Sequence, residues 1–264
     1  LVSSTMDALE AFNGIPSATV PSGRYAGIIF KPFIAVSGSV LEDPSSITDT
    51  RLNNVTIAVA PAPLSLGYSF EAAANMALLA ARIAQDEPHL DVAGNAYIDM
   101  PTPDAIGAMS DYLTRDAIMK KGCSTVSLVS GQYVVEDFVT TYHKLGENPP
   151  QFRYCRNLIL DFNVRFGYYL LEQLHVVGHV LTNDNTIVTA SKVIKPKRWK
   201  SILTTYAEGL EKRALSADKK FMTDSTTVQI SSTNPDRLQT FFRYKRTGTV
   251  RVASTVAEAG FNFG

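Results

Sequence analysis

The sequence predicts an α/β fold, with a mixed, largely parallel sheet flanked by helices and a C-terminal extended strand arm. Short, continuously apolar runs at residues 25–30 and 54–60 are typical of strands buried on both faces of a largely parallel sheet. Further along, strand and helix patterns alternate, which indicates crossover helices. A last alternating pattern at residues 249–257 follows an apparently complete core.

Composition and charge indicate a globular protein and argue against several other classes of protein. Hydrophobic residues make up 45% and charged residues 19%, as in ordinary globular proteins. The net charge is zero, which is compatible with self-association and argues against a dedicated nucleic-acid binder. Two cysteines cannot build a disulfide framework. No apolar run reaches the ~18 residues of a membrane span, so we expect no membrane partner.

The N-terminal half contains further predicted helices, a further strand and one loop. Residues 5–12 resemble a short helical end, and residues 38–50 are rich in Ser, Asp and Pro and predict a loop. Residues 97–100 are a strand candidate. Residues 69–85 predict an Ala-rich helix that follows the strand at 54–60. Its expected inward face consists of Phe70, Ala74, Ala77, Leu78 and Ala81.

A further helix is predicted between Thr102 and Gly122. Thr102 is the expected N-cap, followed by a first-turn Pro103 and an acidic residue. A basic last turn and then Gly122 predict its end. Ile106, Met109 and Leu113 are expected to face inward.

A hairpin and a long helix dominate the middle of the chain. Residues 125–135 predict two strands joined by Ser130-Gly131. The helix is expected to begin at Tyr154, with two glycines that weaken it by about 1 kcal/mol each. Its apolar stripe comprises Cys155, Ile159, Phe162, Phe166, Leu170, Leu174, Val177 and Leu181; its polar stripe comprises Asp161, Arg165, Tyr168, Glu172, His175 and His179.

The remaining elements lie between Pro196 and the C-terminus. A helix begins at Pro196, with Trp199, Leu203, Tyr206, Leu210 and Ala214 inward. Residues 226–230 and 238–244 then predict strands. The alternation at 249–257 admits two interpretations. It is either an edge strand on its own sheet or an arm that adds to a neighbour's sheet through main-chain hydrogen bonds.

Candidate chemistry is sparse. Glu172, His175 and His179 have a metal-like helical spacing, which admits a metal-dependent hydrolase, although a polar helix face or subunit contact is favoured. Cys123 has no evident histidine partner, and neither a Gly-x-Ser-x-Gly motif nor a phosphate loop occurs. We therefore expect no catalytic residue, metal or cofactor.

Basic residues cluster where the last long helix begins. Cations at a helix N-terminus oppose the helix dipole, so they do not serve local stability. A solvated face, an acidic protein surface and, less favoured, nucleic acid are the open alternatives. The cluster contains Lys195, Lys197, Arg198 and Lys200, and a second basic group occupies residues 243–246.

Several segments resemble the C-terminal part of contractile phage tail sheath proteins of the Mu-like type. The similar segments are residues 51–61, the Ala-rich helix, residues 126–142, residues 183–191 and residues 193–199. The resemblance spans residues 52–264 and depends on the order of segments rather than on one motif. It implies a sheath core at residues 1–246 and an arm at 247–264.

The resemblance implies a mechanical, non-enzymatic function in a virion tail assembled in the host cytoplasm. Sheath subunits form stacked hexameric rings around a tail tube, and their contraction drives the tube through the host envelope for genome ejection. Baseplate and tail terminator proteins are further implied partners. A phage-derived injection system or bacteriocin sheath is the alternative of the same class.

The resemblance also assigns roles to individual residues. In the family, terminal arms add strands to neighbouring subunits, which implies that role for Val250, Arg251, Val252, Ala253, Ser254, Thr255 and Val256. Lys195, Lys197, Arg198 and Lys200 are implied to face the tube. The family's N-terminal arm and part of an outer domain do not appear in this sequence, so we expect them upstream of Leu1. A subtilisin-like label occurs in the family, but no Ser/His/Asp motif supports proteolysis here.

Overall fold

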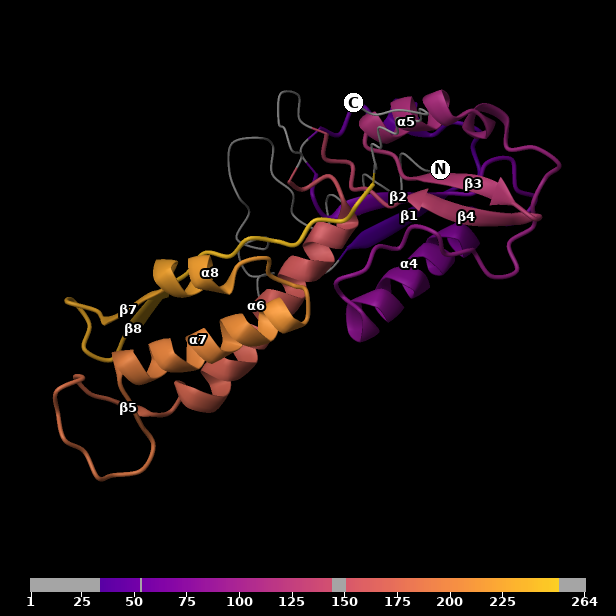
Figure 1. The fold of residues 1–264 in the computed structure, drawn as a ribbon. Helices are drawn as coiled ribbons and strands as arrows, with labels where there is room; N and C mark the ends of the chain where they lie inside the picture. Colours follow the sequence, from indigo (N-terminus) through magenta and orange to yellow (C-terminus); the bar gives the residue numbers. More distant parts are fainter. Residues whose placement is uncertain (1–33, 53, 144–150, 252–264) are drawn as a thin grey trace, which may run out of the picture.

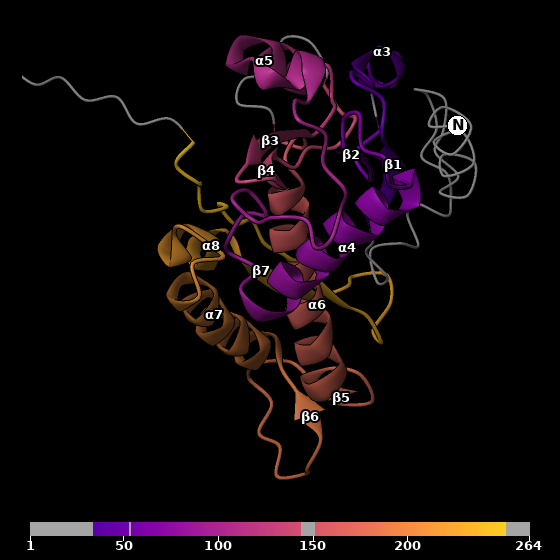
Figure 2. The same ribbon diagram turned by 90° about the vertical axis from the view of Figure 1, so that its right-hand side faces the viewer.

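The computed structural model describes residues 34–52, 54–143 and 151–251. These residues form two regions, a group of strands flanked by helices and an elongated, mostly helical part that projects from it (Figure 1). Figure 2 shows the same division from the side. One helix, described below, begins in the first region and continues into the second.

The first region is built around two parallel strands. β1 (Ala35–Ser39) pairs with β2 (Ile57–Pro61), so that Ala35 lies opposite Ile57. Every residue of β2 is buried, as its continuously apolar sequence predicts. β1 and the short helix α3 (Ser45–Thr48) overlap the predicted loop at 38–50, which was therefore partly wrong.

α4 (Ser69–Asp86) confirms the predicted helix at 69–85 and packs against β1. Gly38 permits this close approach, because a Cβ atom there would lie 1.6 Å from the carbonyl oxygen of Ser69. The predicted inward face was wrong. The residues that α4 buries are Ala72, Met76, Leu79 and Ile83.

α5 (Tyr112–Lys120) covers the opposite side of the strands from α4 (Figure 1). The prediction of its end is confirmed, since Gly122 follows with a φ of 77°. Its predicted start at Thr102 was wrong, because the residues before it form only the 3-10 turn η2 (Gly107–Ser110). Asp111 is the N-cap, and its carboxylate accepts a hydrogen bond from the Thr114 backbone N–H at 2.8 Å.

Two other predictions in this region have opposite outcomes. The hairpin is confirmed, with β3 (Thr125–Val129) antiparallel to β4 (Gln132–Asp137). Positive φ angles at both turn residues, 50° at Ser130 and 74° at Gly131, fit the twist of a two-residue hairpin. No strand forms at 97–100. The preceding residue, Ala96, makes an isolated antiparallel bridge to Val134 of β4.

α6 (Cys155–His175) leaves the first region and ends six residues before Leu181, the last position of the predicted stripe. A turn with Gly178 at a φ of 74° ends the helical path. The chain then forms β5 (Val180–Leu181), which pairs in parallel with β6 (Val193–Ile194). The predicted helix was therefore too long. The apolar periodicity continues past His175, and it does not reveal that Gly178 adopts a positive φ that ends the helix.

The second region is completed by α7 (Pro196–Lys212), α8 (Lys219–Ser225) and the antiparallel strands β7 (Thr227–Ile230) and β8 (Leu238–Phe241). α7 and β7 confirm the predicted elements, and β8 confirms the first part of the strand predicted at 238–244. Ala214, predicted to face inward, instead lies beyond the end of α7 and is exposed, and α8 was not predicted. We call β1–β4, α4 and α5 the body. The extension consists of the second half of α6 with α7, α8 and β5–β8.

The α/β class is confirmed, but the pairing is more mixed than predicted. Of the four two-stranded sheets in the described residues, β1–β2 and β5–β6 are parallel and the two others are antiparallel. Residues 130–131 join β3 to β4, and residues 231–237 join β7 to β8, because antiparallel neighbours need no long crossover. The predicted elements at 5–12 and 25–30, and most of the arm pattern at 249–257, lie outside the described residues.

Candidate assembly surfaces

The three predicted metal-ligand candidates do not share one helical face. His175 is the last residue of α6, and His179 lies beyond the left-handed Gly178. The Glu172 carboxylate accepts a hydrogen bond from the Tyr168 hydroxyl at 3.3 Å. Among residues 34–52, 54–143 and 151–251, no group of three or more His, Cys, Asp or Glu side chains is placed to hold a metal ion.

Both cysteines belong to the interior. Cys123 and Cys155 are fully buried, and burial raises the pKa of each thiol above its usual value. Such thiols remain protonated at neutral pH and are poor nucleophiles. Their position fits the packing role of a small apolar side chain.

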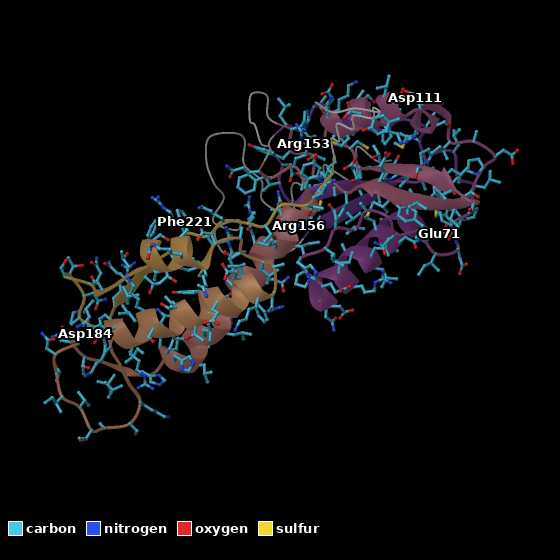
Figure 3. All side chains as sticks on the ribbon, in the orientation of Figure 1. Glu71, Asp111, Arg153, Arg156, Asp184 and Phe221 are labelled. Atoms are coloured by element: carbon cyan, nitrogen blue, oxygen red, sulfur yellow. The ribbon has the colours of Figure 1, made fainter. Side chains whose placement is uncertain are left out.

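The basic cluster lies at the end of the extension away from the body. Lys197, Arg198 and Lys200 are exposed at the start of α7. The Asp184 carboxylate, labelled in Figure 3, accepts a hydrogen bond from the Lys197 backbone N–H at 2.8 Å. The Asp184 carboxylate thus places a negative charge at the N-terminus of α7, where the first turn of the helix itself contains no acidic residue. Lys195 is half-buried, and its ammonium group donates to the Thr186 carbonyl.

An apolar stripe on the second half of α6 lies in solvent. We call Phe166, Leu170, Leu174 and Val177 the α6 stripe; their exposed fractions lie between 50% and 66%. The same face is buried at the start of the helix, where Cys155 belongs to the body core and Ile159 is also buried. The prediction of a core face was therefore right for the first half of α6 and wrong for the second.

α4 also presents an apolar face to solvent, formed by the residues predicted to point inward. Phe70 is 65% exposed and Leu78 is 56% exposed. The Tyr68 ring stacks on Phe70 with centroids 5.3 Å apart. We call Phe70, Ala74, Ala77, Leu78 and Ala81 the α4 face; all five are exposed. Because α4 is apolar on its buried side as well, periodicity could not separate the two faces.

Buried polar contacts join the first half of α6 to residues 244–247. Asp161, predicted on an outer polar stripe, is buried at 3% exposure. Its carboxylate accepts a hydrogen bond from the Tyr244 hydroxyl at 2.7 Å and forms a two-pronged ion pair with the Arg246 guanidinium at 2.8 and 2.5 Å. Arg156, also buried and labelled in Figure 3, donates to Thr247. Sequence periodicity placed Asp161 correctly on the helix but could not show its distant partners.

Only the first two predicted arm residues fall within the described chain. Val250 is 84% exposed. The Arg251 guanidinium contacts Asp91, donates to the Asp137 carboxylate at 2.6 Å and lies 3.6 Å from the centre of the Tyr154 ring. Arg251 thus contacts its own body. Residues 252–264 of the predicted arm lie outside the described residues.

None of the helices in the described ranges combines the length and the apolar character that crossing a membrane requires. No family model matches the sequence. No curated protein matches it either.

Two solved structures share this fold. A chain of the anti-feeding prophage (AFP) baseplate, from a six-fold symmetrised cryo-EM structure, aligns with a TM-score of 0.59 and 13% identity over 98% of this chain and 73% of its own. The sheath tail protein of Desulfitobacterium hafniense aligns with a TM-score of 0.54 and 15% identity over 93% of this chain. This chain spans 55% of that sheath protein. The chain therefore shares its fold with a sheath tail protein and with a chain of a prophage baseplate.

Proposed function

We propose that the protein is a structural, non-catalytic subunit of a contractile tail sheath. The observation that carries this proposal is the similarity of nearly the whole chain to a sheath tail protein and to a chain of the anti-feeding prophage baseplate. Fold similarity alone does not assign function. The exposed surfaces described above supply the independent support.

The apolar surfaces favour an assembled state. Soluble monomers rarely expose large contiguous apolar patches, and such patches mark interaction sites. The α6 stripe and the α4 face are two different surfaces on two different helices. Two unlike surfaces on one chain suit a head-to-tail contact, which closes into a ring or continues as a helix. Stacked hexameric rings combine both arrangements.

In this proposal the subunits surround a tail tube, and ring contraction drives the tube through a host envelope. The exposed cations Lys197, Arg198 and Lys200 face an acidic tube surface, with Lys195 beside them. Interfacial charge of this kind guides partner choice and orientation more than it adds affinity. Baseplate and terminator proteins are the expected partners at the two ends of a virion tail.

A phage-derived injection particle is the second candidate. It is supported by the baseplate of the anti-feeding prophage, whose chain aligns with 98% of this sequence. The subunit chemistry is the same in both candidates. Electron microscopy of particles purified from the native source separates them, because only a phage carries a capsid.

Deletion of residues 248–264 tests the proposed assembly. The segment is predicted to add a strand to a neighbouring subunit, where main-chain hydrogen bonds supply affinity. The truncated protein should keep a folded core by circular dichroism and lose ordered tubes or rings in negative-stain images. A control truncation that removes residues 261–264 leaves the alternating pattern intact and should preserve assembly. Normal tubes from the longer deletion would contradict the arm assignment.

A further inference from the structure

The last described residues cross from the extension to the body. Residues 244–251, which we call the strap, run from the end of β8 past the start of α6 toward the body (Figure 1). Asp161 holds the strap at Tyr244 and Arg246. Arg156 then donates to Thr247 at 2.8 Å. The strap is thus fixed at its first half by buried charges of α6.

A second attachment lies at the end of the strap. Arg251 contacts three residues from three separate segments of the body: Asp91 after α4, Asp137 at the end of β4 and Tyr154 before α6. The side chain of Asp91 is 8% exposed and that of Asp137 is 21% exposed. The guanidinium lies between two largely buried carboxylates and over an aromatic ring. This arrangement suits arginine, whose planar group can bond two carboxylates and stack on a ring at the same time.

Between the two attachments the chain has few contacts. Gly248, Thr249 and Val250 are exposed, and Val250 is 84% exposed. Without Arg251, the strap beyond Thr247 would behave as a flexible tail. Arg251 is therefore the last attachment to the body in the described part of the strap.

We propose that Asp91, Asp137 and Tyr154 form a socket for the Arg251 guanidinium, and that this socket anchors the C-terminal segment to the body. The mechanical meaning of the anchor rests on the proposed sheath function. A segment that links subunits must transmit load to a rigid part of its own subunit, and the socket provides that attachment. Arg251 is a positioning residue here, not a contact to the neighbour.

The electrostatics indicate that the socket fixes the position of the strap more than it adds to the free energy of folding. Burial raises the pKa of Asp137, and the nearby Arg251 only partly opposes this shift. An ion pair whose desolvation cost rivals its Coulomb attraction adds little to the free energy of folding. Its directional hydrogen bonds still select one exit point for the chain.

Paired spin labels on Gln85→Cys and Val250→Cys measure the exit point directly. Both positions are exposed, and the two native cysteines are buried with raised pKa values, so they resist labelling. In the otherwise unchanged protein, we expect a narrow distance distribution. Arg251→Gln should broaden it about twofold, because the residues after Thr247 become a flexible chain. Arg251→Lys should also broaden it, since one ammonium group cannot bridge both carboxylates with a planar fork.

Control variants show whether a broader distance distribution comes from loss of the socket. Arg237→Gln removes an exposed arginine in the β7–β8 connection and should leave the distribution unchanged. Asp91→Asn with Asp137→Asn should broaden it without touching the strap. An equally narrow distribution in Arg251→Gln, or a broad one in the parent, would overturn the socket. If the socket holds but the parent forms no tube or ring, the proposed sheath function fails while the anchor stands.

Discussion

The body and the extension differ in how they bury their apolar residues. The body has one continuous core that includes β2, the inner face of α4 and the β3–β4 hairpin. The extension is held by two smaller clusters, one around Leu160 and Leu210 and one around Trp199. The α6 stripe remains outside both clusters. The comparison indicates that the body gathers its buried apolar residues into one core, whereas the extension divides its own between two smaller clusters.

A matched pair of leucines on α6 provides the sharpest test of this difference. Leu160 is fully buried, and Leu160→Ala should lower the free energy of unfolding by about 2–5 kcal/mol through lost burial and a cavity. Leu170 is 50% exposed, and Leu170→Ala should change stability by no more than about 0.5 kcal/mol. Urea denaturation measures both values. A large loss of stability in Leu170→Ala would place the α6 stripe inside the fold.

The ion pair between α6 and the strap should produce the next largest effect. Asp161→Asn leaves the Arg246 guanidinium without its buried carboxylate, which costs on the order of 3 kcal/mol. Asp224→Asn is the control, because its pair with Lys220 is exposed and contributes about 0–1 kcal/mol. Thermal unfolding by calorimetry compares the two variants. Equal transition temperatures would mean that Asp161 does not hold the strap.

The turn of the β3–β4 hairpin should have a smaller effect, confined to the body. Gly131 has a φ of 74°, so Gly131→Ala should destabilise the protein by about 1 kcal/mol. Gly209→Ala is the control, because Gly209 lies within α7 with open space around its Cβ position. Alanine favours a helix, so this variant should be neutral or stabilising. Destabilisation of the same size in both variants would contradict the assigned turn.

The smallest expected effect is a local pH dependence at α5. Hydrogen bonds from Thr114, first from its backbone N–H, lower the pKa of Asp111 below its ordinary value. A carboxyl group with a lowered folded-state pKa adds stability above its unfolded pKa, near 4, and loses it as the pH falls through the folded value. NMR titration of the Asp111 carboxyl carbon measures this pKa. A value at or above 4 would remove its role as the N-cap.

Local signals in the sequence were sufficient for much of the body and for α7. The buried run of β2, the Ser130-Gly131 turn and Pro196 each act within a few residues, so pattern recognition locates them. The faces of α4 and α6 could not be assigned in this way. Each helix is apolar on more than one side, and only its packing partners decide which side is buried.

Long-range polar contacts were also beyond the sequence. Asp184 caps α7 from 13 positions away, and Arg251 reaches Asp91 across 160 positions. Such pairs depend on the assembled fold rather than on spacing. The predicted arm residue Arg251 was recognised for its place in an alternating pattern, while its contacts with the body could be seen only in the structure.

Negative-stain electron microscopy of the purified protein, over a range of concentrations, tests the central claim most directly. We expect rings or stacked tubes with a hollow centre, because in the proposed assembly other copies of the chain cover the exposed α6 stripe and α4 face. The double variant Leu170→Asp with Leu174→Asp should stay folded and unassembled. A monodisperse monomer at every concentration, with the native stripe intact, would contradict the account.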